Sequence, residues 1–244
     1  MLAVLGAGVF AGTINTIVGS GTLVSFPVLL AVGLGPVTAN VTNTIGLVPG
    51  SVSGAVGYRA ELAGQRGRVL RLGTASVLGG IAGAVLLLQL PGEAFETIVP
   101  VLIGVALVLV VAQPRLSRVL AERRAATAHG GAPVWLGVFG TGVYGGYFGA
   151  AQGVILLALF GIALPEDLQR ANALKNVLAA MVNSVAAAIF IVVAPVAWPE
   201  ALLLAAGAVV GGQLGAKVGR RLSPGLLRAV IVVVGLVAIA QLVL

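Results

Sequence analysis

The chain has 244 residues, of which 59% are hydrophobic and 9% are charged, with a mean hydropathy of +1.13 and a formal net charge of +7. Soluble domains carry about 25% charged residues, so a soluble protein is excluded and an integral membrane protein is predicted. Basic residues lie in short loops between apolar runs, which indicates membrane topology and not a nucleic-acid partner, and the absence of cysteine excludes disulfides and thiolate metal sites.

Eight apolar runs have the length that crosses or enters a bilayer. Two of them are interrupted: Leu2–Gly33 at Gly19–Thr22, and Val134–Ala163 at Gly149–Gln152. The basic segment Gln113–Pro133 separates the runs into two groups of four and contains the only histidine, His129. The uninterrupted runs are Val37–Tyr58, Val69–Leu90, Phe95–Val111, Ala171–Ala194, Ala201–Val218 and Leu226–Leu244.

The two halves of the chain match each other at a near-constant offset. This predicts one membrane repeat over residues 1–112, a basic cytoplasmic linker over 113–133, and a second membrane repeat over 134–244. The matching landmarks, each with a partner 130 to 133 residues later, are Gly12, Gly19, Ala39-Asn40, the "GGIAG" row from Gly79 and Pro91-Gly92.

The loop charges predict the topology. Loops after the second, fourth and seventh runs are basic, whereas those after the third and sixth carry the acids Glu93, Glu96 and Glu200. Basic loops face the cytoplasm. Counting the crossings places every loop on the side that its charge indicates only if each interrupted run enters and leaves the membrane on the same side. The predicted fold is therefore an all-α integral membrane protein of two inverted repeats. Each repeat is a re-entrant, broken helix hairpin followed by three transmembrane helices, and both termini lie outside. A glycine kink within one long helix is the alternative to the hairpin.

Inverted repeats with broken helices are typical of secondary transporters, whose substrate site lies near the midplane between the repeats. Irregular backbone at that depth is tolerated only where it is buried in protein or lines a cavity. The second half of each hairpin begins with free N–H groups and a positive dipole end, which suits a small anion. Thr22 is the expected N-cap, Ser20 adds a hydroxyl next to Gly21, and Gln152 takes the position of Thr22 in the second repeat.

A polar stripe follows each hairpin. Asn40, Asn43, Thr44, Ser51 and Gly54 share one helix face, and their repeat partners are Asn172, Lys175, Asn176, Asn183 and Ala186. Polar side chains within a span usually face the bundle or a cavity, although asparagines that only join helices are the alternative. Lys175 is either an anion ligand or a side chain that snorkels to the headgroups. The predicted substrate-binding residues are Ser20, Gly21, Thr22, Asn43, Gln152, Lys175, Asn176 and Asn183.

Several chemistries lack the residues they need. All seven acids map to loops or helix ends, so a buried carboxylate proton relay is not expected. The sequence has no Walker A motif and no metalloprotease motif or embedded carboxylate pair. We therefore expect no enzyme activity, no catalytic residues, no metal and no cofactor.

The chain resembles the sulfite exporter TauE/SafE family of bacterial membrane permeases over nearly its whole length. The resemblance rests on "AGTINTIVGSGTLVSFPVLLAVGLGPVTANVTNT" and on its echo "YGGYFGAAQGVILLALFGIALPEDLQRANALKNVLA". It implies a multi-pass protein of the bacterial inner membrane that transports sulfite, thiosulfate or organosulfonates such as sulfoacetate, usually outward. The expected partners are the anionic substrate and the lipid bilayer, and a homodimer is left open. An importer of the same anions and a non-transporting membrane scaffold are the competing hypotheses.

Overall fold

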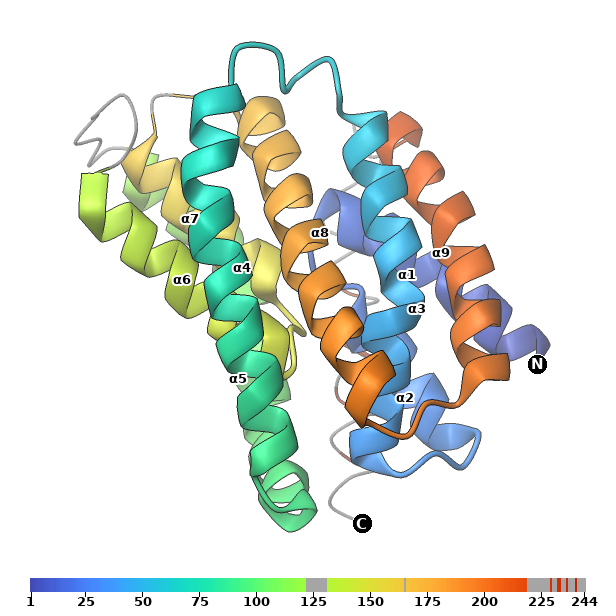
Figure 1. Cartoon of the computed structure of the whole chain (residues 1–244). Coiled ribbons are helices and arrows are strands. Elements are labelled where there is room, and N and C mark those ends of the chain that lie inside the picture. Colours follow the sequence, from blue (N-terminus) through green and yellow to red (C-terminus); the bar gives the residue numbers. More distant parts are fainter. Residues whose placement is uncertain are drawn as a thin grey trace.

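The computed structural model describes residues 1–121, 131–164 and 166–218, together with the single positions 229, 232, 233, 236 and 240. This described part is helical and contains no strand (Figure 1). His129 and, apart from those single positions, the predicted run Leu226–Leu244 lie outside the described residues. The helices are α1 (Leu2–Ile17), α2 (Thr22–Ala31), α3 (Pro36–Gly57), α4 (Arg66–Gln89), α5 (Gly92–Ala121), α6 (Gly131–Tyr147), α7 (Gln152–Ala163), α8 (Leu168–Val193) and α9 (Trp198–Val218).

Both predicted interruptions are confirmed. One separates α1 from α2 and the other separates α6 from α7. Each contains a glycine with a positive φ, 85° at Gly19 and 72° at Gly149, a conformation in which other residues are strained. These glycines are repeat partners at an offset of 130, so the same local chemistry breaks the helix in both halves.

Within the described residues, four helices are long and apolar enough to cross a membrane: α4, the first part of α5 to Ala112, α8 and α9. α3 has 22 residues but is not among them, because asparagine, threonine and serine lower its hydropathy. α1, α2 and α7 are apolar but shorter than the roughly 20 residues that a crossing needs. α5 continues to Ala121, beyond the expected start of the linker, and Arg66, Arg68 and Arg71 belong to α4 although a loop was expected there.

The helices of the two repeats pack mainly against each other. By the repeat offset, α1 corresponds to α6, α3 to α8 and α4 to α9. α1 packs against α9 while α6 packs against α4, and α3 and α8 pack against each other (Figure 1). Glycines at these contacts let the backbones come close: a Cβ on Gly211 would lie 2.1 Å from the Val9 carbonyl oxygen, and one on Gly83 would lie 2.1 Å from that of Val143. Close backbone approach of this kind is typical of helices in membranes.

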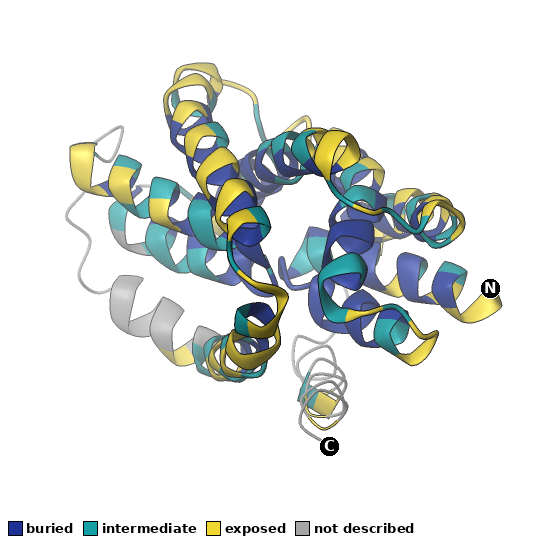
Figure 2. Ribbon diagram, turned by 60° about the horizontal axis from the view of Figure 1, so that its bottom comes forward, coloured by how far each residue is buried: buried dark blue, intermediate teal, exposed yellow. Residues whose placement is uncertain are grey.

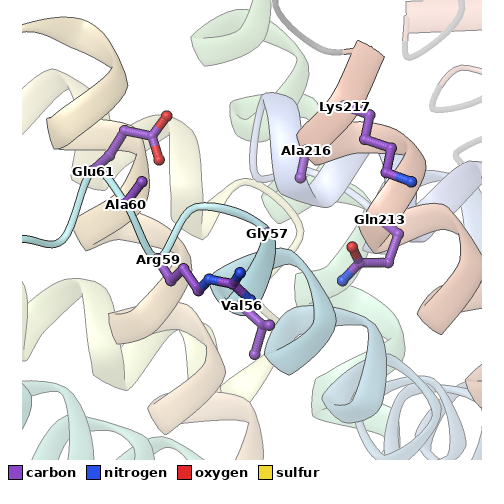
Figure 3. A pocket seen from close by; sticks show the side chains of 8 residues that line it. All are labelled: Val56, Gly57, Arg59, Ala60, Glu61, Gln213, Ala216 and Lys217. Atoms are coloured by element: carbon purple, nitrogen blue, oxygen red, sulfur yellow. The ribbon is translucent and has the colours of Figure 1, made fainter.

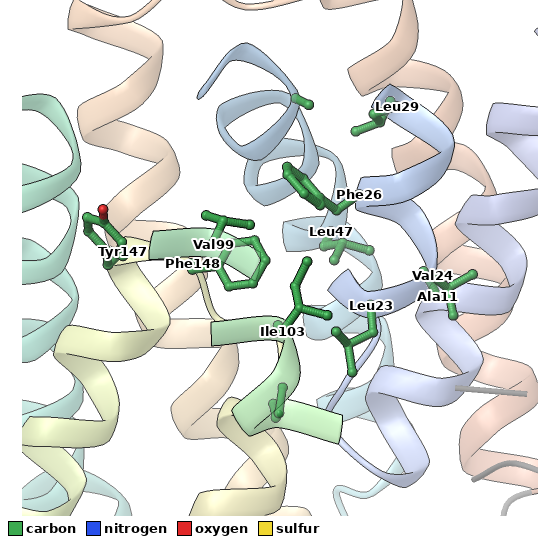
Figure 4. Packing of buried hydrophobic residues seen from close by; sticks show 14 of the residues in the cluster. Ala11, Leu23, Val24, Phe26, Leu29, Leu47, Val99, Ile103, Tyr147 and Phe148 are labelled. Carbon is green, nitrogen blue, oxygen red and sulfur yellow. The ribbon is translucent and has the colours of Figure 1, made fainter. Parts of the chain in front are cut away.

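The largest apolar cluster surrounds the ends of the half-helices. Phe26 of α2 and Phe148 after α6 pack edge to face with ring centroids 5.3 Å apart, and Phe95 of α5 adjoins both. Val99 and Ile103 of α5 point into this cluster (Figure 4). The outer faces of the helices are exposed (Figure 2). Exposed apolar side chains of α5 include Val101, Val105 and Val108. An apolar outer face is suited to lipid.

Candidate functional site at the helix breaks

The two helix breaks touch each other in the interior. The Gly153 N–H, at the start of α7, donates to the Gly19 carbonyl oxygen in the first break at 3.0 Å. A Cβ on Gly19 would lie 2.3 Å from the Gly153 Cα, and one on Gly153 would lie 2.9 Å from the Lys175 Cδ. Only glycines permit this approach, which brings one backbone segment of each repeat to a common point beside Lys175.

Lys175 of α8 is fully buried at this point, with an exposed fraction of 0%. Its Nζ donates to the carbonyl oxygens of Asn15 and Thr16 at 3.0 and 3.1 Å. These carbonyls lie at the C-terminal, negative end of α1, so the lysine stabilises the end of that helix. The alternative that Lys175 snorkels to the headgroups is wrong, because its amine points into the protein. In the part of the chain that the structure describes, no carboxylate lies within ion-pair distance of Lys175.

Two asparagines of α8 share an acceptor with Lys175. The Nδ2 atoms of Asn172 and Asn176 lie 3.3 and 3.2 Å from the Thr16 carbonyl oxygen. A carbonyl oxygen has two lone pairs, whereas three donors from α8 converge on this one. At least one of these donors is therefore not fully used by the protein.

The same contact recurs in mirrored form in the other repeat. Asn40, the repeat partner of Asn172, donates from its Nδ2 to the Tyr147 carbonyl oxygen at 2.9 Å. Tyr147 is the last residue of α6, just before the second break. Each asparagine thus holds the C-terminal end of the other repeat's first half-helix. The Oδ1 atoms of both asparagines are buried without a hydrogen-bond partner in the described structure.

The role predicted for Thr22 is wrong. The N-cap of α2 is Gly21, with no side-chain cap, and Thr22 is the first helical residue. Instead the Thr22 Oγ1 accepts from the Asn43 Nδ2 at 3.1 Å, and the Asn43 Oδ1 accepts from the Ser25 hydroxyl at 2.5 Å. The amide of Asn43 therefore joins α3 to α2, which is the structural role that the sequence left open for these asparagines.

The prediction that the N–H groups of the second half-helices lack partners is also wrong for most of them. Leu23 and Val24 donate to the carbonyls of the first break, and the first three residues of α7 all donate, Gly153 among them to Gly19. Side chains supply the unused donors instead. The Ser20 Oγ and the Gln152 Nε2 are buried and have no partner in the described structure.

Asn183 lies one layer away from the breaks. Its Nδ2 donates to the Ser51 Oγ at 3.3 Å, and the Asn15 Nδ2 donates to the same oxygen at 3.2 Å. Ser51 and Asn183 are repeat partners at an offset of 132, so equivalent positions of α3 and α8 meet. Through Asn15, Asn183 is connected to a carbonyl that accepts from Lys175. The remaining predicted residue, Gly21, packs against α1, where its Cβ would lie 2.4 Å from the Ala11 carbonyl oxygen.

Ser20 and Gln152 adjoin Gly19 and Gly153, the residues through which the breaks touch, and Lys175 and Asn176 bond to the end of α1. The Gln152 side chain lies against Gly145 of α6, and Thr22, Asn43 and Asn183 bond to neighbouring helices. Sequence reasoning missed Asn15, Thr16 and Gly153. Asn15 and Thr16 were detectable as polar residues directly before a break. Gly153 carried no signal, because its importance comes only from contact with the other repeat.

A separate cavity of about 500 Å³ lies between the C-terminal ends of α3 and α9 (Figure 3). The basic residues Arg59 and Lys217, one from each half of the chain, both line this cavity. Both belong to loops or helix ends that the charge pattern predicts to be cytoplasmic. The cavity is lined by Val56, Gly57, Arg59, Ala60, Glu61, Gln213, Ala216 and Lys217.

An ion-pair cluster joins the N-terminal ends of α4 and α8. Glu166 binds Arg68 at 2.8 Å and Arg170 at 2.5 Å. Burial by itself raises the pKa of the Glu166 carboxyl, but the hydrogen bonds and charges of the two arginines outweigh it and hold this pKa below its usual value. Asp167 caps α8 by accepting from the N–H groups of Gln169 and Arg170.

Comparison with known proteins finds relatives that are named as probable membrane transporters. The chain is 28% identical over 234 residues to the probable membrane transporter protein YfcA of Escherichia coli (strain K12), covering 95% of this chain and 85% of the relative. It is 25% identical over 236 residues to a probable membrane transporter protein of Haemophilus influenzae (strain ATCC 51907 / DSM 11121 / KW20 / Rd), covering 97% and 91%. It is 27% identical over 242 residues to the probable membrane transporter protein ORF9 of a Sinorhizobium species, covering 94% and 87%. No solved structure matches the chain significantly.

The family models give the same result over nearly the full length. The model described as sulfite exporter TauE/SafE matches residues 4–242. This range contains both helix breaks and the packing of each repeat against the other. The chain therefore belongs to the sulfite exporter TauE/SafE family, a family of membrane transporters.

Proposed function

We propose that this protein exports small sulfur-containing anions, sulfite or organosulfonates such as sulfoacetate, across the bacterial inner membrane. The observation that carries the proposal is Lys175, which is fully buried beside the touching breaks with no carboxylate partner among the described residues. Burying a cation without a counter-charge is costly. An anion bound there removes that cost, and the family name adds that the anion contains sulfur.

The side chains around Lys175 supply the remaining contacts. A sulfonate or sulfite presents three acceptor oxygens, and the unused donors of Ser20 and Gln152 lie on the two breaks that meet there. Asn176 competes with Lys175 for the Thr16 carbonyl oxygen and so has a donor to offer. Gly21, Thr22, Asn43 and Asn183 shape the surroundings of the site.

The proposed architecture is two inverted repeats with the site between them. Its support is the exchange of equivalent contacts, since α1 packs on α9 as α6 packs on α4. The ends of the molecule support it further. The first turns of α3 lie beside Gly92 and Ala197, and these two residues are next to the acids that begin α5 and α9. The basic residues Arg59, Arg68 and Lys217 belong to the opposite helix ends.

The proposal is tested with purified protein. Thermal-shift measurements against sulfite, sulfoacetate, thiosulfate, sulfate and taurine should show stabilisation by at least one sulfur anion, since a ligand at 100 times its Kd adds about 2.7 kcal/mol. The matched variant is Lys175→Asn, which installs the residue of the repeat partner Asn43 and should abolish the shift while the protein remains folded. A protein that no anion stabilises is the scaffold of the competing hypothesis.

The direction of transport needs a second assay. Cells that express the protein are loaded with the stabilising anion, and its efflux is compared with uptake from the medium, with Lys175→Asn as the control in both arms. Faster efflux supports the exporter. Uptake without efflux would identify an importer of the same anion.

A further inference from the structure

Lys175 has two acceptors for its amine in the described structure, the carbonyl oxygens of Asn15 and Thr16. A neutral amine has two N–H groups to donate, whereas an ammonium has three. The two carbonyls therefore offer one acceptor for each N–H group of the neutral form. The third hydrogen of the charged form has no acceptor among the described residues, and its charge has no counter-ion there.

The helices around Lys175 offer no other group for this charge. α8 packs against α3, α4, α6 and α7, and it contacts the end of α1 through hydrogen bonds. α1, α3 and α7 contain no titratable side chain. α6 contributes Tyr144 and Tyr147, and tyrosines titrate well above neutral pH.

Besides Lys175, the charged groups on α4 and α8 are arginines near the start of each helix. α4 carries Arg66, Arg68 and Arg71 in its first two turns, and α8 carries Arg170 in its first turn. Arg68 and Arg170 bind Glu166. No aspartate or glutamate occurs within any of these helices, so the counter-ion of an ammonium at Lys175 is an anion that arrives from outside the protein.

From this geometry we infer that the anion and a proton bind together, with Lys175 as the group that carries the proton. The inference rests on the proposed function. On one side of the membrane the Lys175 lone pair takes a proton from water as the anion binds, and the third N–H of the ammonium donates to the anion. On the other side the anion leaves and the proton returns to water, so one anion and one proton cross together. The coupling needs no carboxylate within the membrane.

Proton uptake measured by calorimetric titration tests the inference. Purified full-length protein is titrated between about pH 7 and 9 with sulfoacetate, thiosulfate and sulfate, whose charge is constant in this range, and with sulfite and taurine corrected for their own titration. Buffers of different ionisation heat report the protons taken up. We expect uptake to approach about one proton per anion, and affinity to fall about tenfold per pH unit, above the pH at which the free amine is neutral.

The matched control is Lys175→Arg, because a guanidinium stays charged throughout this range. We expect it to bind the anion with no proton uptake and with an affinity independent of pH. Binding to the original protein without proton uptake, or uptake that persists in Lys175→Arg, overturns the inference but leaves the proposed function standing. Failure of every anion to bind the original protein overturns the proposed function, and the inference falls with it.

Discussion

The Ser20 hydroxyl is buried in the first break without a partner, although a buried polar group normally has one. Ser20→Ala therefore removes no hydrogen bond from the free protein, and we expect an unchanged or slightly higher melting temperature. If Ser20 donates to the anion, its loss costs about 1 kcal/mol of binding, or roughly fivefold in Kd. Calorimetric titration with the stabilising anion measures this change.

Ser25→Ala is the matched control for that experiment. The Ser25 hydroxyl donates to the Asn43 Oδ1, so its removal leaves a buried acceptor unsatisfied and should lower the melting temperature. An anion affinity that is the same in Ser20→Ala and in the original protein would remove Ser20 from the site.

Gly19 combines a positive φ with direct contact between the repeats. We expect Gly19→Ala to destabilise the protein by more than the roughly 1–2 kcal/mol of a left-handed residue, because the added carbon overlaps the Gly153 Cα. Gly33→Ala separates the two effects, since Gly33 has a φ of 96° but no atom within 4 Å of its Cβ position. Thermal unfolding of both variants in detergent measures the difference. Equal losses of stability in Gly19→Ala and Gly33→Ala would mean that the two helix breaks separate easily.

At the scale of elements, the Glu166 cluster fastens the start of α8 to the start of α4. Because the folded pKa of Glu166 is lowered, its stabilisation is complete above the unfolded pKa near 4.3 and is lost as pH falls through the lower folded value. Glu166→Gln should therefore cost about 1–3 kcal/mol at neutral pH and progressively less at acidic pH. Melting curves across this pH range measure the loss of stability. The control is Glu96→Gln, because Glu96 is an exposed acid at the start of α5. A pH-independent loss would argue against the charged interaction.

Most helix positions were predictable because each depends on a local property. The positive-φ glycines mark both breaks, and apolar runs of sufficient length mark α4, α8 and α9. The partners of each polar group were not predictable, because they come from other helices and, for Asn40, Asn172, Lys175 and Asn176, from the other half of the chain. Thr22 looked like a cap, but the nearby amide of Asn43 bonds its hydroxyl. Lys175 looked able to reach the headgroups, but two carbonyls at the end of α1 hold it inside.

At the scale of the whole molecule, the charge pattern makes a prediction about orientation. A cysteine replacing His129 should not react with a membrane-impermeant reagent in intact cells, because basic segments remain in the cytoplasm. A cysteine replacing Glu200 should react, since that turn is expected outside. The natural chain contains no cysteine, so each variant reports a single site. Labelling at position 129 in intact cells would reverse the proposed topology.

The seven acids lie outside the middle of the predicted spans, so none should be needed to move a proton. We expect transport to persist when each acid is changed singly to its amide. Efflux from loaded cells, with the amount of folded protein measured in parallel, is the test. A folded amide variant without flux would restore a carboxylate to the mechanism.

The hydrogen bond from Gly153 to Gly19 has a mechanical consequence. A carrier must open first to one side of the membrane and then to the other. Because the tips of the two breaks are tied together, they either travel as one body while the outer helices rock around them, or the tie breaks in every cycle. The first course keeps the Gly153 amide shielded from water throughout turnover, so slow deuterium exchange at this single amide during active transport would identify the tips as the pivot.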